Sequence, residues 1–155
     1  MGVGKTAVSQ CMKTILPDSV FLDGDWCWDS SPFHVTDETK AMVMDNICHT
    51  LNNFISCSVY ENVIFCWVMH EQSIIDDILG ETDCSSCSVR VISLLASEQT
   101  LTQRLFKDIN EGIRTPDVLQ RSVKRIPLYD KLKSEKIITD GKTVRQIADE
   151  IIALS

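Results

Sequence analysis

The chain has 155 residues, a hydrophobic fraction of 44% and a net charge of −7. This length is typical of one folded domain, and the hydrophobic fraction is high enough for a packed core and too high for a disordered chain. Because surfaces that bind nucleic acids are rich in Lys and Arg, the acidic charge argues against a nucleic-acid partner.

The first element in the chain is a helix over residues 5–16, and a glycine-rich motif precedes it in "MGVGKT". Gly4, Lys5 and Thr6 match the last three positions of the phosphate-binding loop G-x-x-x-x-G-K-S/T. In such a loop, backbone N–H groups and the helix dipole bind phosphate, the Lys reaches the outer phosphates and the hydroxyl holds Mg²⁺. The sequence therefore predicts a nucleotide-binding segment made of Gly2, Val3, Gly4, Lys5, Thr6 and Ala7. The alternative is a glycine-rich start to an ordinary helix.

A short buried strand, Val20–Leu22, follows and ends in Asp23-Gly24-Asp25. Phosphoryl transfer needs two such carboxylates, one to hold Mg²⁺ and one to accept or orient the attacking hydroxyl. We assign Asp23 to the metal and Asp25 to the acceptor, against the alternative of an ordinary Asp-Gly turn. Trp26, Trp28 and Phe33 come next, and they either line an acceptor pocket or fill the core.

The remaining strands and helices alternate along the chain. The predicted strands are Val63–Val68, Val89–Leu95 and Lys136–Ile138. The predicted helices are 37–55, with Thr36 or Asp37 as cap; 71–80, ended by Gly80; 98–112, with Ser97 as cap and Gly112 at the end; 115–126, with Pro116 in the first turn; and 144–154, with Thr143 as cap. This alternation predicts an α/β fold with a parallel sheet and helices on both faces.

A basic stretch lies between the fourth helix and "IPLYD" and contains Arg104, Arg114, Arg121, Lys124 and Arg125. Arginines on a mobile flap stabilise the charge that develops on a transferred phosphoryl group. We therefore predict a lid at about residues 112–127. Arg121 and Arg125 share a helix face because they are four residues apart. The alternative is a solvated helix face.

The seven cysteines are an odd number, and Cys11, Cys48 and Cys66 lie in apolar segments. This distribution is typical of free thiols in a reducing compartment, so we expect a cytoplasmic protein. No apolar run is long enough to cross a bilayer, and we expect no membrane partner. The role of Cys84 and Cys87, a single C-x-x-C in a polar loop, stays open.

The chain resembles the P-loop kinases that phosphorylate small metabolites: shikimate, gluconate and adenylylsulfate kinases, and related antibiotic-modifying or resistance proteins. "FLDGD", "VRVISLLASEQTLTQRL" and "KRIPLYDKLKSEKIITD" carry the resemblance, which covers nearly the whole chain. It implies one domain over residues 1–155, a three-layer fold, and ATP and Mg²⁺ as cofactors.

The resemblance also implies roles for individual residues. Arg125 would contact the acceptor together with Asp25, and Arg121 would be a catalytic residue that faces the transferred phosphate. Arg104 would lie near adenine. The loop of Asp140, Gly141 and Lys142 would border the adenine. We add Arg114, Trp26 and Trp28 to the predicted substrate-binding residues. The sequence departs from shikimate kinases at "WVMHE", where they carry three glycines, and in the helix 37–54, whose one basic residue is Lys40; we therefore expect another acceptor.

In the family that the chain resembles, the strand before the phosphate-binding loop is the central one, in the sheet order 2-3-1-4-5. The first Gly of the motif would precede Met1, so we expect a shortened chain whose central strand is missing. The leading hypothesis is an ATP-dependent kinase that acts on a hydroxyl of an unidentified small molecule. The alternatives are a nucleotide-binding regulator without an acceptor and an inactive, truncated remnant. The oligomeric state stays open.

Overall fold

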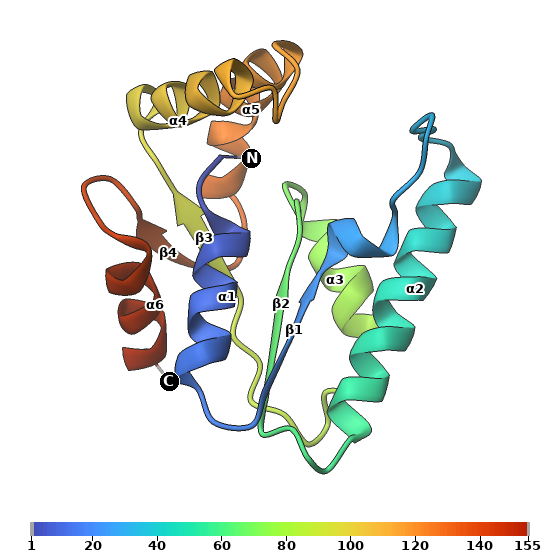
Figure 1. Cartoon of the computed structure of the whole chain (residues 1–155). Coiled ribbons are helices and arrows are strands. Elements are labelled where there is room, and N and C mark those ends of the chain that lie inside the picture. The colour runs from blue at the N-terminus through green and yellow to red at the C-terminus, as the bar shows by residue number, and fades with distance from the viewer. Residues whose placement is uncertain (1, 155) are drawn as a thin grey trace.

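The computed structural model describes residues 2–154, and it contains the predicted alternation of strands and helices (Figure 1). The strands are β1 (Ser19–Asp23), β2 (Asn62–Cys66), β3 (Ile92–Leu95) and β4 (Glu135–Ile138). The helices are α1 (Lys5–Ile15), the 3-10 helix η1 (Gly24–Cys27), α2 (Asp37–Ser56), α3 (Gln72–Glu81), α4 (Glu98–Asn110), α5 (Asp117–Asp130) and α6 (Val144–Ala153). No helix of this part of the chain is both long and apolar enough to cross a membrane.

The strands form two separate parallel pairs instead of one continuous sheet. β1 pairs with β2, with Phe21 opposite Ile64, and β3 pairs with β4, with Leu94 opposite Ile137. In space, no strand of the described chain lies between β2 and β3. The prediction of a parallel sheet that lacks its central strand is therefore confirmed.

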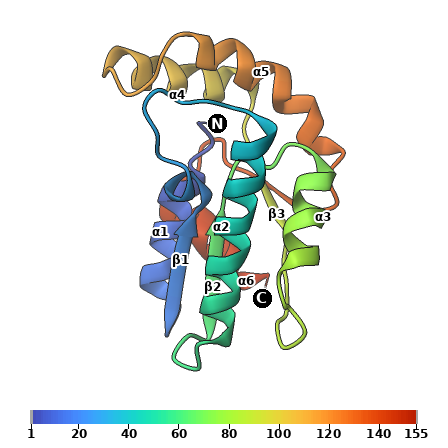
Figure 2. The same ribbon diagram turned by 90° about the vertical axis from the view of Figure 1, so that its right-hand side faces the viewer.

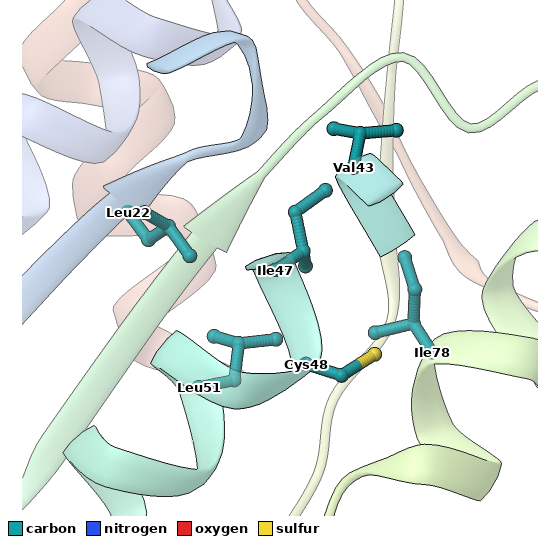
Figure 3. Packing of buried hydrophobic residues seen from close by; sticks show 6 residues of the cluster. All are labelled: Leu22, Val43, Ile47, Cys48, Leu51 and Ile78. Carbon is teal, nitrogen blue, oxygen red and sulfur yellow. The ribbon is translucent and has the colours of Figure 1, made fainter. Parts of the chain in front are cut away.

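Helices cover both faces of the strand pairs, which gives three layers (Figures 1 and 2). On one face, Leu22 of β1 packs with α2 and α3 in a cluster of buried residues. Figure 3 shows this cluster, which comprises Leu22, Val43, Ile47, Cys48, Leu51 and Ile78. The period-2 alternation of a strand sends Phe21 and Ile64 to the opposite face, where Met12 and Leu16 of the α1 segment cover them.

A second core lies under α1 and α6, and a third lies at the carboxyl ends of the strands. Val8 of α1 packs with Ile147 and Ile151 of α6 and with Ile137 of β4. In the third core, α4 and α5 pack together through the buried side chains of Leu101, Leu105 and Val118. Figure 1 shows α4 and α5 lying across the end of the molecule where the strands terminate.

Three predicted helix starts are confirmed by their caps. Thr36 and Thr143 each form a capping box, and the Ser97 hydroxyl accepts from the Thr100 N–H. Gly112 follows the end of α4 with a φ of 72°, and its N–H donates to the carbonyl of Ile109. A left-handed glycine is the usual stop for a helix, so this predicted end is also confirmed.

Other predicted boundaries are wrong. The predicted strand Val89–Leu95 begins only at Ile92, and the predicted strand Val63–Val68 ends at Cys66. Gly80 does not end α3, which continues to Glu81; the Thr82 hydroxyl then donates to the carbonyl of Ile78.

Pro127 does not bound the fifth helix either, because α5 continues through it to Asp130. A proline inside a helix lacks the N–H that would bond to the fourth residue before it, here Val123, so the ladder of α5 is interrupted at that point.

Candidate functional site

The segment before α1 has the backbone that close phosphate contact requires. Gly2 and Gly4 have φ angles of 78° and 91°, a region that L side chains rarely adopt. A Cβ at Gly2 would lie 2.9 Å from side-chain atoms of Leu101 and Leu105, whereas one at Gly4 would meet nothing within 4 Å. Gly4 is the N-cap of α1, and no side chain caps this helix within residues 2–154. The helix N-terminus thus presents N–H groups and a positive dipole end to an anion.

Thr6 and Asp23, the two predicted metal ligands, lie in direct contact. The Thr6 hydroxyl donates to Asp23 Oδ2 at 2.6 Å, and the Asp25 N–H donates to Asp23 Oδ1 at 3.1 Å. Asp23 is 5% exposed, so these two bonds hold a buried carboxylate at the end of β1. Hydroxyl and carboxylate oxygens are the donors that Mg²⁺ prefers, and Mg²⁺ commonly uses one or two protein ligands together with phosphate oxygens and water. The donor set at this point fits that ion.

Lys5 lies beside the same carboxylates at the start of α1. Burial lowers the pKa of Lys5 from its ordinary value, and Asp25 and Asp23 oppose this effect. The nearby Cys66 thiol contributes no charge at neutral pH, because burial, with a contribution from Asp23, raises its pKa to about 11. Lys5 is therefore held beside two carboxylates in a partly buried position.

Asp25 is exposed, and an aromatic side chain orients it. The indole Nε1–H of Trp67 donates to Asp25 Oδ1 at 3.1 Å. The absence of a side chain at Gly24 makes this contact possible, since a Cβ there would lie 2.5 Å from Trp67 Cγ. Trp67 follows directly after β2, so the carboxyl ends of β1 and β2 meet in this pair.

The predicted acceptor aromatics are arranged in two contacts. Trp26 is 57% exposed and meets Phe21 edge to face at 5.2 Å. Trp28 lies against Phe33 with ring centroids 4.6 Å apart, and it also packs against the cluster under α2. Trp26 is thus presented to solvent beside Asp25, while Trp28 is partly in the core.

The residues predicted to border adenine tie the carboxyl ends of β3 and β4 to the phosphate-binding segment. Arg104 donates to the hydroxyl of Thr139 at 3.0 Å and to its carbonyl at 3.2 Å, and it also reaches the carbonyl of Val3 at 3.5 Å. Asp140 accepts from the Ser97 N–H at 2.9 Å. The Thr100 hydroxyl, followed by Ser97, lowers the pKa of Asp140. Gly141 has a φ of 68°, and Lys142 forms an ion pair with Glu150.

The three lid arginines occupy different positions. Arg114 forms an ion pair with Asp108 at 2.9 Å and lies close enough to Lys5 to lower its pKa. Arg121 forms an ion pair with Asp117 at 2.7 Å and faces solvent. Arg125 is half-buried near His70.

His70 follows β2, and its side chain is 20% exposed. Burial lowers the pKa of His70, and the positive charge of Arg125 adds to this effect. Its Nδ1 has no hydrogen-bond partner within the described chain. Arg125 is thereby positioned over the carboxyl end of β2.

The structure thus brings together Lys5, Thr6, Asp23 and Asp25, with Arg114 nearby, and leaves Arg121 on the outer side of α5. Three partners were not assigned from the sequence: Trp67 as the partner of Asp25, His70 beneath Arg125, and Thr139 as the partner of Arg104. The only sequence signal was that Trp67 and His70 follow a strand whose carboxyl end belongs to the predicted site.

Comparisons with known proteins agree with this geometry. The solved structure of the Deinococcus radiodurans tunicamycin resistance protein matches with a TM-score of 0.74 and 16% identity, over 99% of this chain and 89% of that one. A gluconokinase from Sinorhizobium meliloti 1021 matches with a TM-score of 0.67 and 19% identity, over 99% and 85%. The fold is therefore that of the P-loop small-molecule kinases. A family model described as an AAA domain matches residues 1–123, and the chain belongs to this family. No curated protein matches the chain.

Proposed function

We propose that the protein is a Mg²⁺-dependent phosphotransferase that uses ATP to phosphorylate a hydroxyl of a small molecule. One observation carries the proposal: the Thr6 hydroxyl is bonded to the buried Asp23 carboxylate at 2.6 Å, next to Lys5 at an uncapped helix N-terminus. The alternative of an ordinary Asp-Gly turn does not account for this bond to the Gly-Lys-Thr segment. ATP, when bound with Mg²⁺, supplies the phosphoryl group.

Each residue of the site then has a role that its position supports. The N–H groups of residues 4–7 bind the phosphate oxygens, and Lys5 neutralises the outer phosphates. Thr6 and Asp23 hold the metal ion. Asp25, with Oδ1 fixed by Trp67 at 3.1 Å, accepts the proton of the acceptor hydroxyl through Oδ2.

The remaining predicted residues complete the site. Trp26 and Trp28 line the acceptor pocket with Arg114 and Arg125, and Arg121 stabilises the transferred group when the lid closes. Arg104 and the loop of residues 140–142 border the adenine.

The acceptor is a polyol or a hydroxyl-bearing metabolite with an apolar face. The two solved structures of the same fold are named for gluconate and for tunicamycin, and both compounds belong in the acceptor panel. Exposed Trp26 beside Asp25 supports an acceptor with one apolar side.

The test is formation of ADP from Mg²⁺–ATP by the purified chain, with and without each compound of a metabolite panel. We expect turnover that depends on one acceptor. Turnover that is equal in the absence of any acceptor would favour an NTPase, and no nucleotide binding at all would favour an inactive remnant.

Lys5→Ala is the matching variant, and we expect it to reduce acceptor-dependent turnover at least about 100-fold, because a positioned cation at the reacting phosphate contributes several kcal/mol. Lys13→Ala is the control, since Lys13 is exposed in the last turn of the same helix. If Lys5→Ala keeps activity within about tenfold of wild type, the segment does not bind the reacting phosphates.

A further inference from the structure

The loop between α3 and β3 carries Cys84 and Cys87, and the proposed function uses neither of them. Figure 1 shows this loop at the end of the molecule opposite α4 and α5, so it lies away from the start of α1. Both cysteines are free thiols; Cys84 is half-buried and Cys87 is exposed, whereas Cys48 and Cys66 are buried in the core. The loop pair is therefore accessible to reagents in solution that the core cysteines do not meet.

A tight turn brings the two loop cysteines together. The Cys87 N–H donates to the carbonyl of Cys84 at 3.0 Å. This is the hydrogen bond of a β-turn, whose first and fourth Cα atoms lie within about 7 Å of each other, and a disulfide joins Cα atoms about 4.4–6.8 Å apart. The side chains also interact: burial raises the pKa of the Cys84 thiol, and the negative charge of a Cys87 thiolate adds to this effect. The span of the turn is therefore compatible with a disulfide between the two.

One side chain of α2 holds the backbone that leads into this turn. Asn52 Nδ2 donates to the carbonyl of Glu81 at 3.0 Å, and Asn52 Oδ1 accepts from the Asp83 N–H at 2.8 Å. Asp83 Oδ1 in turn accepts from the Ser85 N–H at 3.1 Å. Because these bonds already order the backbone, a disulfide that closes here costs less conformational entropy than one in a free loop.

A cavity of ≈ 760 Å³ lies beside the turn. Cys84 lines it, together with Asn53 and Ser56 of α2 and Ser86 of the loop. Amide and hydroxyl side chains both donate and accept hydrogen bonds. These surroundings favour the approach of a hydrophilic small molecule to Cys84.

We propose that Cys84 and Cys87 are a redox-active dithiol that exchanges with small hydrophilic disulfides, such as oxidised glutathione, and closes to an intraloop disulfide. The thiolate of exposed Cys87 attacks one sulfur of the small disulfide, which forms a mixed disulfide at Cys87 and releases one small thiolate. The Cys84 thiolate then attacks Cys87 Sγ, forms the bond between the two cysteines and releases the second small thiolate. The two protein thiols lose two protons and two electrons, and the small disulfide is reduced to two thiols. The proposal does not rest on the proposed enzymatic function.

The test equilibrates the purified full chain with mixtures of reduced and oxidised glutathione, quenches the exchange with acid and alkylates the remaining thiols. Chymotryptic cleavage after Leu79 and Leu94 releases a peptide whose two cysteines are Cys84 and Cys87, and mass spectrometry identifies its oxidation state. Cys57 is the control thiol, because it is half-buried like Cys84 and has no other cysteine near it in the sequence. We expect the intraloop disulfide to form at a ratio of oxidised to reduced glutathione at least about tenfold lower than the ratio that modifies Cys57.

Two serine variants separate the roles of the two thiols. In Cys84→Ser we expect a glutathione adduct to persist on Cys87, because the second thiol that would displace it is removed. In Cys87→Ser we expect Cys84 to react at least about tenfold more slowly than Cys87 does in Cys84→Ser, because burial leaves less of Cys84 as the reactive thiolate. Cys57→Ser is the matched control and should leave the intraloop disulfide unchanged.

Asn52→Ala tests whether the fold prepares the turn. We expect this variant to lower the equilibrium constant for the intraloop disulfide about three- to tenfold, because the backbone before the turn is no longer held. Asn53→Ala, the neighbouring exposed residue that lines the same cavity, should keep the wild-type constant. Far-UV circular dichroism checks that each variant is folded, and the wild-type and serine forms decide the proposal if Asn52→Ala is not.

Four outcomes would overturn the proposal. In the first, the wild-type peptide carries glutathione on either cysteine but no intraloop disulfide. In the second, Cys84 or Cys87 pairs instead with another cysteine of the chain or of a second copy. In the third, the peptide stays a dithiol in mixtures that modify Cys57. In the fourth, a folded Asn52→Ala variant forms the disulfide as readily as the wild-type chain, which would show that the pair reacts as it would in any free loop.

Discussion

At the residue scale, Gly24 decides how the Asp25 carboxylate is held. A Cβ at this position would lie 2.5 Å from Trp67 Cγ, so a larger residue displaces the indole that donates to Asp25. We expect Gly24→Ala to lower the free energy of unfolding by about 1–3 kcal/mol, as overpacking does, and to reduce turnover more than nucleotide affinity. Urea unfolding and steady-state kinetics measure the two effects.

Gly80→Ala is the matched control for this prediction. Gly80 lies inside α3, and a Cβ there would meet nothing within 4 Å. Because Ala is the better helix former, we expect this variant to be stabilised by about 0.5–1 kcal/mol. If Gly24→Ala is as stable as Gly80→Ala, the contact between Gly24 and Trp67 does not constrain the site.

His70 makes the free energy of unfolding depend on pH. Burial and Arg125 lower the pKa of His70 in the folded protein, so the unfolded chain binds more protons once the pH falls below the ordinary value of about 6.5. The free energy of unfolding must then fall as the pH falls through this range. We expect His70→Gln to reduce this loss between about pH 7 and 5.5, measured by urea unfolding at a series of pH values.

His49→Gln serves as the control, because His49 is exposed on α2. It should keep the pH dependence of the wild-type chain. An unchanged slope in His70→Gln would show that the imidazole is not held neutral by its surroundings.

At the scale of elements, α5 contains most of the predicted lid, and it extends beyond its predicted end. Its start is interpretable from Pro116 and Asp117, but its extension past Pro127 is not, since proline normally ends a helix. Gly112 at 72° precedes it, so the segment has a flexible left-handed residue before it and an interrupted hydrogen-bond ladder near its end. We expect both features to allow α5 to change its orientation when a ligand binds.

The proposed role of Arg121 needs such a motion, because its guanidinium pairs with Asp117 at 2.7 Å and faces solvent. An ion pair this exposed to solvent contributes little to stability, so little opposes its release. We expect Arg121→Lys to slow the chemical step while ATP affinity holds, because Lys cannot form the two parallel hydrogen bonds of Arg. Pre-steady-state kinetics with the identified acceptor measures this step.

Arg125→Lys, from the same helix face, should instead raise the acceptor KM, and Lys124→Ala on the exposed side should change neither constant. If both arginine variants have wild-type kinetics, the basic stretch is a solvated helix face and the prediction of a lid is wrong.

The elements also show what a sequence can specify. Local signals identified the helix starts at Thr36, Ser97 and Thr143, because a cap depends on residues within one turn. The end of α3 at Glu81 could not be predicted from Gly80 alone, since glycine tolerates both helix and turn. The late start of β3 has a tertiary cause: in the described chain β3 pairs with β4 only, and the first backbone bond between them runs from the Glu135 N–H to the carbonyl of Val91 at 2.9 Å.

At the scale of the whole molecule, the site is assembled from segments that lie far apart in the chain. The phosphate-binding motif and the family resemblance together predicted the interruption between β2 and β3, because the motif requires a preceding strand and the resemblance implies that this strand is the central one of the sheet. Periodicity and motif spacing did not predict that Arg104 would bond to Val3, 101 residues away, or that Trp67 would bond to Asp25, 42 residues away. Such contacts depend on how complete layers pack.

The interrupted sheet makes α1 the main connection between the two strand pairs. Met12 packs against the core under α1 and α6 and also against the core of Phe21 and Ile64. Met44, which is half-buried like Met12, packs only against the cluster of Leu22 and Ile47. Met12 is therefore a contact between the two parts, and Met44 is a matched side chain within one of them.

We expect Met12→Ala to uncouple the unfolding of the two strand pairs, whereas Met44→Ala should only lower stability. Each variant should lose about 1–2 kcal/mol, less than the 2–5 kcal/mol of fully buried sites. The chain has three tryptophans, Trp26, Trp28 and Trp67, and all of them lie beside β1 and β2, so fluorescence reports that half, while far-UV circular dichroism reports every helix. In Met12→Ala the urea midpoints of the two probes should differ, and in Met44→Ala they should move together, since coincidence of probes is the mark of a cooperative transition. Coincident midpoints in Met12→Ala would show that α1 is not what joins the two halves.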